Sequence, residues 1–209
     1  MAPLRRIVMI FITGHHDTGK STLAKYFIEN NFLHVETGNI VRSLYKAENP
    51  EIKFEDWAKG KGQLFDDHII EEVKKAQLLV VKENRQDVVI TGNRQIEGVN
   101  KICEKMPPLE GKKHLIVYVE ADPQILFVRH QGRPDRSIPG LTFESFSKNI
   151  LGYDQEMGVE EIKKSADLII CNACQAELFF SCFTSKFKEF GYNLKPPFEG
   201  QDFCRARRI

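Results

Sequence analysis

The sequence predicts an α/β protein in which a five-stranded parallel sheet is covered by helices on both faces. Short apolar runs rich in β-branched residues recur along the chain, stretches with helical periodicity separate them, and the first run leads directly into a glycine-containing loop. Strands and helices that alternate in this way are typical of parallel sheets buried on both faces, with right-handed crossovers. The strands are expected at residues 7–13, 32–36, 87–91, 114–119 and 166–171.

Helical periodicity lies between these strands. Residues 22–29 place Leu23, Ala24, Phe27 and Ile28 on one face of a helix. Further helices are expected at residues 54–82, 95–105, 123–130, 142–157 and 176–190. We expect one domain over residues 1–192, followed by a tail over residues 193–209 whose Pro-Pro, glycine and basic end predict a surface strap or partial disorder.

Composition limits the classes of partner. A length of 209 residues favours one domain, and 30 Lys and Arg against 29 Asp and Glu give a net charge of +1, with no general reason to expect nucleic acid or a membrane surface. No segment approaches the roughly 20 apolar residues of a membrane span, and the N-terminus lacks a signal-peptide cleavage site. The five cysteines include one CxxC, Cys171 and Cys174, without a second pair. Reduced thiols and a cytoplasmic protein are the simplest interpretation, and the oligomeric state is left open.

The first apolar run ends in Gly14-His15-His16-Asp17-Thr18-Gly19-Lys20-Ser21, a full match to the GxxxxGK[ST] phosphate-binding loop, or P-loop. Gly14 and Gly19 permit backbone angles that turn the N–H groups toward phosphates. Lys20 is expected to reach the β- and γ-phosphates of ATP, and the Ser21 hydroxyl to ligate magnesium, while the following helix adds its positive end. We expect the whole loop and Thr22 to bind the nucleotide.

Three residues of the loop carry polar side chains at positions that the motif leaves unspecified. His15 and His16 are adjacent and point in different directions, which disfavours a shared metal site. We expect their side chains to face solvent or the acceptor, and only their backbone to bind phosphate. Asp17 is a candidate for positioning water or the acceptor.

Motifs of other P-loop classes are missing. A GTPase needs Asn-Lys-x-Asp, but Asn100-Lys101 is followed by Ile-Cys. A molecular-machine ATPase normally needs a longer domain and an acidic pair after a strand. By contrast, Thr37-Gly38-Asn39-Ile40-Val41-Arg42 resembles the Thr-Gly-Asp-x-x-Arg segment of adenylate kinases. That resemblance implies that Thr37, Gly38 and Arg42 bind the acceptor, with Arg42 on its phosphate.

Later segments extend this resemblance over roughly residues 7–185. Thr91-Gly92-Asn93-Arg94-Gln95 is similar to the kinase element whose arginine grips the transferring phosphate, which implies that role and acceptor contact for Arg94. Arg129, Arg133 and Arg136 fall in a segment that resembles the kinase lid, here about residues 129–140, whose arginines clamp nucleotide phosphates. Residues 141–146 and 166–172 look like archaeal adenylate-kinase-related and dephospho-coenzyme-A-kinase-like proteins.

The resemblance implies a P-loop NTP hydrolase-type three-layer fold with a small lid, and an enzyme that uses ATP and Mg²⁺ to phosphorylate a small nucleotide-like acceptor. Phosphoryl transfer needs in-line positioning and positive charge, which Lys20, Arg94, Arg129 and Arg133 would supply. A nucleoside monophosphate presents an ionised oxygen and needs no base.

Two departures from the kinase pattern keep alternatives open. Asn39 replaces an aspartate, and Thr91 replaces the acidic residue that organises the water shell of magnesium, a role that Glu36 or Asp17 could take over. Glu36 is also the candidate base for a hydroxyl acceptor such as dephospho-coenzyme A or a nucleoside. A third alternative is a nucleotide-binding regulator without efficient turnover, and the near-neutral charge disfavours a kinase of nucleic-acid ends.

Overall fold

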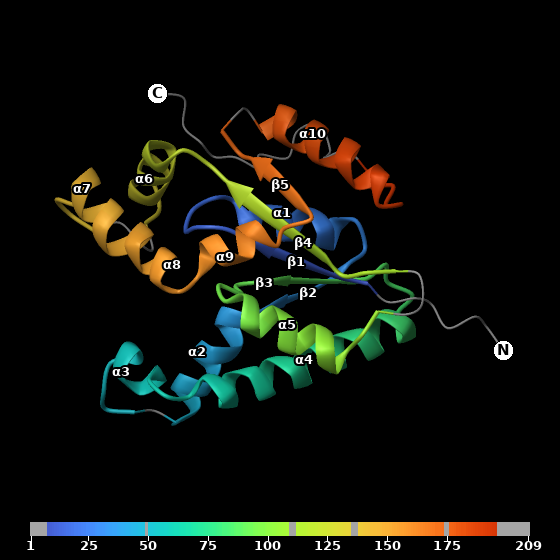
Figure 1. Ribbon diagram of the computed structural model, residues 1–209, viewed down its shortest axis with the longest axis horizontal. Helices are drawn as coiled ribbons and strands as arrows, with labels where there is room; N and C mark the ends of the chain where they lie inside the picture. Colours follow the sequence, from blue (N-terminus) through green and yellow to red (C-terminus); the bar gives the residue numbers. More distant parts are fainter. Residues whose placement is uncertain (1–7, 49, 109–111, 135–137, 174–175, 196–209) are drawn as a thin grey trace.

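The computed structural model describes residues 8–48, 50–108, 112–134, 138–173 and 176–195. At its centre lies a parallel sheet of five strands in the order β2-β3-β1-β4-β5 (Figure 1). The strands are β1 Met9–Thr13, β2 Leu33–Glu36, β3 Val88–Thr91, β4 Leu115–Glu120 and β5 Leu168–Cys171. The fold class predicted from the sequence is therefore confirmed.

Strand β1 lies in the middle of the sheet and is buried along its whole length. It pairs in parallel register with β3 on one side and β4 on the other. Its side chains alternate between the two faces, so that Ile10 and Ile12 belong to one core cluster and Met9 and Phe11 to the other. A strand covered on both faces is apolar along nearly its whole length, which explains the apolar run that leads up to Thr13.

The helices form a layer on each face and a further group near the carboxyl ends of the strands (Figure 1). Their bounds are α1 Lys20–Glu29, α2 Thr37–Glu48, α3 Phe54–Ala58, α4 Gly62–Lys82, α5 Ile96–Lys105, α6 Pro123–Gln131, α7 Phe143–Phe146, a π-helix η1 Ser147–Leu151, α8 Gly152–Glu156, α9 Val159–Lys164 and α10 Ala176–Glu189. Helices α1 and α10 pack on one face, and α4 and α5 pack on the other.

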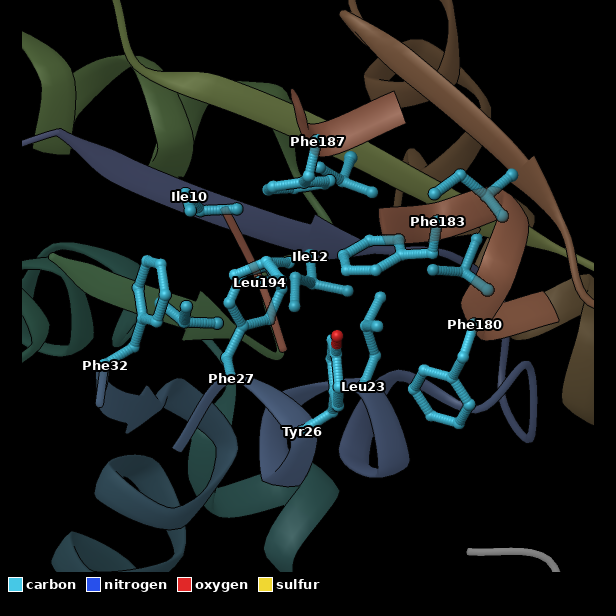
Figure 2. Close-up of a cluster of buried hydrophobic side chains, with 14 of the residues drawn as sticks. Ile10, Ile12, Leu23, Tyr26, Phe27, Phe32, Phe180, Phe183, Phe187 and Leu194 are labelled. Carbon is cyan, nitrogen blue, oxygen red and sulfur yellow. The ribbon is translucent and has the colours of Figure 1, made fainter. Parts of the chain in front are cut away.

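Aromatic rings fill the core between α1, α10 and the sheet (Figure 2). The centroid of the Phe27 ring lies 5.4 Å from that of Phe183 and 5.2 Å from that of Phe187, both edge-on. Such pairs contribute about 0.5–1.5 kcal/mol each beyond burial. The Tyr26 hydroxyl donates a hydrogen bond to the carbonyl of Lys195, which ties the chain after α10 back to α1.

The elements near the carboxyl ends of the strands differ most from the expectations. Helix α2 and helix α9 were not expected. The helix expected at residues 54–82 is interrupted, because the chain turns through Gly60 with φ of 74° between α3 and α4. The helix expected at residues 142–157 consists of α7, η1 and α8 in succession.

The expected lid and tail are described only in part. Helix α6 covers the first residues of the lid range, and residues 132–134 and 138–140 follow it. Arg136 lies outside the described residues, as do residues 196–209 of the expected tail. A small cluster of Leu126, Phe146 and Leu151 joins α6, α7 and η1, so the helices on either side of the lid range pack on one another.

We expect Phe183→Ala to lower the free energy of unfolding by about 3–5 kcal/mol, because it removes a fully buried ring from the aromatic core. Leu178→Ala on the same helix is the matched control: this side chain is 62% exposed, and its loss should have little effect. Urea denaturation followed by circular dichroism measures both. Similar losses for the two variants would contradict the packing of α10.

Candidate active site

The phosphate loop connects β1 to α1 at the edge where the carboxyl ends of the strands meet. Gly14 and Gly19 adopt φ of 138° and 98°, a region that other residues rarely enter. A β-carbon at Gly14 would lie 2.1 Å from the carbonyl oxygen of Val119 in β4, and one at Gly19 would lie 2.5 Å from Nδ2 of Asn172. The carbonyl of the neighbouring strand therefore requires glycine at position 14, and the positive φ favours glycine at position 19.

Lys20 begins α1, and its ammonium group folds back over the loop. Its Nζ donates to the Gly14 carbonyl at 2.8 Å and also to the His15 carbonyl. Burial disfavours the charged form and lowers the pKa of Lys20 to about 8, with the Asp154 carboxylate opposing that shift. The ammonium is therefore mainly protonated at neutral pH, in a position to meet the phosphates of a nucleotide.

Ser21 and Thr22 follow in the first turn of α1, and Ser21 is exposed. Among the residues that the structure describes, no three His, Cys, Asp or Glu side chains are grouped so that they could hold a metal ion. A magnesium ion here would need phosphate oxygens and water, with the Ser21 hydroxyl as the ligand from the protein. That donor set fits Mg²⁺, which usually keeps several waters and binds beside substrate phosphates.

The side chains of His15 and His16 were expected to face solvent or the acceptor; they are only 16% and 20% exposed, and His15 is bonded to carboxylates of α8 and α9 and His16 to one of α8. His16 Nδ1 lies 2.9 Å from Asp154 Oδ2, and the backbone N–H of His16 donates to the same oxygen at 2.6 Å. His15 Nε2 lies 3.1 Å from Glu160 Oε1. Two carboxylates from distant helices thus hold one side of the loop.

These contacts determine the pKa values of the cluster. Burial lowers the pKa of His16. Asp154 opposes this shift, and the positive charge of Arg94 adds to it. Burial also acts on His15, but Asp154 and Glu160 outweigh it and raise its pKa. The Asp154 carboxyl is buried as well, yet hydrogen bonds from His15 and His16 hold its pKa well below the usual range. Asp154 is therefore ionised at neutral pH.

Asp17 holds the other side of the loop. Its backbone has φ of 59°, and its side chain is only 1% exposed. Oδ2 lies 2.8 Å from His130 Nδ1, and Oδ1 accepts from Arg133 Nη1 at 3.1 Å. Asp17, expected to position water or the acceptor, is thus bonded to Arg133, expected to clamp phosphates. Together with His130, this contact links the loop to α6 and the segment after it.

Arg129 of α6 lies beside the end of β5. Its Nη2 donates to the Asn172 carbonyl at 2.9 Å, and Asn172 Nδ2 in turn donates to the Thr18 carbonyl at 2.8 Å. Its Nη1 is buried without a hydrogen-bond partner in the described part of the chain. A buried donor left unpaired is costly, so this N–H is suited to an incoming oxygen.

Glu36, at the end of β2, faces Thr91 at the end of β3. The Thr91 hydroxyl donates to Glu36 Oε2 at 2.6 Å, so the oxygen of that hydroxyl is left to accept from His34 Nε2 at 2.8 Å. A β-carbon at Gly92 would lie 2.6 Å from Glu36 Oε1. The carboxylate is thus oriented by the hydroxyl that replaces the acidic residue of the kinase pattern.

The predicted acceptor residues lie beside Glu36. Thr37 is buried at the start of α2, and Arg42 is exposed one turn later. Arg42 Nη2 donates to Asn39 Oδ1 at 2.7 Å. A β-carbon at Gly38 would lie 3.1 Å from Arg42 Nη1 and 3.3 Å from Glu36 Oε1, so this guanidinium and this carboxylate face the same glycine.

Trp57 anchors the α2–α4 region. The residue is buried, and its ring centroid lies 5.3 Å from that of Tyr45 and 5.4 Å from that of Phe65. Its Nε1 donates to Glu48 at 2.6 Å, and Lys61 Nζ lies 4.3 Å from the ring centroid. Trp57 therefore packs between α2 and α4.

Sequence reasoning missed Asp154, Glu160 and His130, which bind the loop from α8, α9 and α6. The histidine pair and the acidic residue inside the loop were the available signal, because polar side chains that become buried need partners. Nothing in the sequence indicated which distant residues those partners are.

A parallel sheet whose central strand leads through a GxxxxGK[ST] loop into a helix defines a P-loop kinase-like protein, as the resemblance implied. The chain belongs to the AAA domain family, whose model matches residues 10–151. Similar sequences include UPF0200 proteins from Thermococcus onnurineus, 27% identical over 81% of this chain and 91% of the relative, and from Saccharolobus solfataricus, 29% identical over 83% and 88%.

Solved structures with a similar fold include kinases. The shikimate kinase from Bacteroides thetaiotaomicron has a TM-score of 0.56 at 15% identity and covers 88% of this chain and 97% of its own. A gluconokinase from Sinorhizobium meliloti has a TM-score of 0.55 at 13% identity, covering 90% and 99%. Across the described residues, none of the helices has the length and apolar character needed to cross a bilayer.

We expect the affinity for ATP to fall as the pH rises above about 8, because the lowered pKa of Lys20 makes its ammonium lose a proton there in the free protein. Lys20→Ala should bind ATP about 10–100-fold more weakly at pH 7.5, the worth of a charge-assisted hydrogen bond, and should lack this pH dependence. Titration with a fluorescent ATP analogue measures both.

Lys25→Ala is the matched control, since Lys25 is exposed on the same helix. It should keep the affinity and the pH dependence of the wild type. Wild-type affinity in Lys20→Ala would show that the loop does not bind a nucleotide through this lysine.

Proposed function

We propose that this protein is an ATP-dependent small-molecule kinase that transfers the γ-phosphoryl group to a nucleoside monophosphate or a similar nucleotide. The observation that carries the proposal is that two positively charged side chains lie at the same loop. Lys20 is bonded to the loop carbonyls, and Arg94 Nη2 lies 2.9 Å from Nε2 of the loop residue His16. Positive charge on both sides of a phosphate loop suits a transferring phosphoryl group.

The donor would lie along the loop. Backbone N–H groups and the N-terminus of α1 bind its phosphates, Lys20 neutralises the β- and γ-phosphates, and the buried Nη1 of Arg129 donates to a phosphate oxygen. Magnesium, held by Ser21 and the nucleotide, supplies further positive charge when bound. Arg133, bonded to Asp17, keeps the segment after α6 against the loop.

The acceptor would lie across the end of the sheet, where Arg42 and Arg94 supply two positive charges from α2 and from the segment after β3. Ligands of open parallel sheets bind at the carboxyl ends of the strands. An acceptor that carries a phosphate provides the anion that two arginines at this edge would bind, and its ionised oxygen needs no base. This charge pattern favours the phosphate acceptor.

Arg42→Ala should raise the KM for the acceptor about 10–100-fold and leave the KM for ATP nearly unchanged, because it removes a charged contact with the acceptor only. Lys46→Ala removes an exposed positive charge one turn further along α2 and serves as the control. A coupled ADP-release assay with nucleoside monophosphates, nucleosides and dephospho-coenzyme A gives both constants. An equal rise in both KM values, or a rise for ATP alone, would contradict the assignment.

A hydroxyl acceptor is the second candidate, and the geometry of Glu36 favours it. The carboxylate accepts from Thr91 through Oε2, while its Oε1 faces Gly92 and Gly38 beside Arg42. A carboxylate oriented in this way at a strand end could accept the proton of an attacking hydroxyl.

Glu36→Gln separates the two acceptor classes. With a hydroxyl acceptor it should lower kcat by about 10²–10⁴-fold, the usual contribution of a positioned base, while affinity for ATP is kept. With a phosphate acceptor the loss should be small, unless Glu36 orders the water shell of magnesium, in which case high Mg²⁺ restores activity. Glu29→Gln, at the exposed end of α1, is the control. ATP binding without turnover on any acceptor would favour the regulator.

A further inference from the structure

Asp154 is a buried carboxylate that the proposed transfer chemistry does not use. Its side chain is 1% exposed, and it accepts hydrogen bonds from the backbone N–H and Nδ1 of His16. It also lies 3.3 Å from Arg94 Nη1. A buried charge costs several kcal/mol unless it is paired, so these contacts are needed for the carboxylate to remain there.

The hydrogen bonds fix the protonation of His16. A guanidinium can only donate, so Nε2 of His16 must accept from Arg94 Nη2 at 2.9 Å. A neutral imidazole that accepts at one nitrogen donates at the other, and Nδ1 therefore carries the proton that is donated to Asp154. The result is a directed chain in which Arg94 donates to His16 and His16 donates to Asp154.

We propose, resting on the proposed function, that His16 and Asp154 are positioning residues that hold the Arg94 guanidinium at the phosphate loop. Asp154 fixes the His16 ring through Nδ1 and attracts Arg94 directly. The His16 ring then accepts from a second nitrogen of Arg94. The guanidinium is thus held at two points, by the ion pair of Nη1 with the carboxylate at 3.3 Å and by the hydrogen bond of Nη2 to the imidazole at 2.9 Å. Tyr153, whose ring lies 5.6 Å from Arg94 Cζ, covers it from the same helix.

The charged groups that face His16, together with its burial, favour a neutral ring on balance and lower its pKa. Arg94 and Lys20 disfavour its protonation, Asp154 favours it, and burial disfavours it most. Protonation would place a donor at Nε2 opposite a guanidinium that can also only donate, and the Arg94 contact would be lost. His15, the neighbouring ring, pairs instead with Glu160 and Asp154.

Helix α8 carries Asp154 and follows the π-helix η1, which in turn follows α7 and the expected lid range. A π-helical turn shifts the face that the next helical turn presents, and such turns are frequent at functional sites. The segment after the lid thus delivers a carboxylate beneath the phosphate loop. The position of Arg94 therefore depends on how that segment packs.

Nitrogen-15 NMR of the imidazoles tests the hydrogen-bond chain without requiring activity. In the full-length wild type at pH 7.5, His16 should be neutral and protonated at Nδ1. Asp154→Ala should make the Nε2-protonated tautomer appear, since the acceptor at Nδ1 and the carboxylate beside Arg94 are both lost. Glu156→Gln, an exposed carboxylate on the same helix, is the control and should leave the tautomer unchanged. Wild-type protein protonated at Nε2 would overturn the proposal.

A double-mutant cycle tests the effect on Arg94. Asp154→Asn and His16→Asn should each lower kcat by about 10–100-fold, as expected for a misplaced catalytic group, with a smaller effect on the affinity for ATP. His16→Asn keeps a donor toward Asp154 and removes the acceptor for Arg94. In an Arg94→Ala background, each change should lower kcat by less than about 3-fold, because the guanidinium that Asp154 and His16 position is already absent.

The outcomes separate the two proposals. If the losses multiply with that of Arg94→Ala, or if thermal unfolding shows that Asp154→Asn no longer folds and His16→Asn leaves kcat unchanged, the positioning role is wrong while the kinase assignment stands. If the wild type turns over no ATP with any acceptor, the kinase assignment and the positioning role both fall. The tautomer then shows whether the hydrogen-bond chain itself is correct.

Discussion

The contact between the backbone at Gly14 and the carbonyl oxygen of Val119 determines the geometry of the whole site. The register of β1 and β4 pairs Thr13 with Tyr118, so the two strands end side by side. At the next residue there is room for a hydrogen but not for a β-carbon, which would lie 2.1 Å from that oxygen. The chain must turn here, and the turn places the following backbone N–H groups and Lys20 around one point. The sheet therefore shapes the loop before any ligand contact is considered.

Charge balance is the second constraint. A loop that carries Lys20 and lies beside Arg94, Arg129 and Arg133 gathers positive charge in a partly buried place. Asp17 within the loop and Asp154 from α8, each with a side chain that is 1% exposed, offset it. Buried ion pairs of this kind add little net stability, because desolvation opposes the attraction. They do select one arrangement, since breaking any contact leaves a buried charge without its partner.

The sequence was sufficient to predict the sheet and the loop, because both depend on local pattern. Apolar runs predicted the strands, and GxxxxGK[ST] predicted the position of Lys20. The sequence was not sufficient to predict α2. Nor was it sufficient to predict the interruption before α4, which depends on a turn at a single glycine, Gly60. The partners Asp154, Glu160 and His130 could not be predicted either, since they lie on helices 113 to 145 residues away from the loop residues that they contact. Such pairings depend on tertiary packing, which periodicity does not encode.

Trp57 is the single tryptophan of the chain. Its indole is enclosed by Tyr45 and Phe65, bonded to Glu48 and covered by Lys61. These neighbours come from α2, α4 and the turn before α4, which flank the proposed acceptor side, whereas the nucleotide loop follows β1 in the centre of the sheet. The protein therefore contains an optical probe confined to one half of its site. Intrinsic emission excited in the indole band follows rearrangement around α2 and α4 without any attached dye.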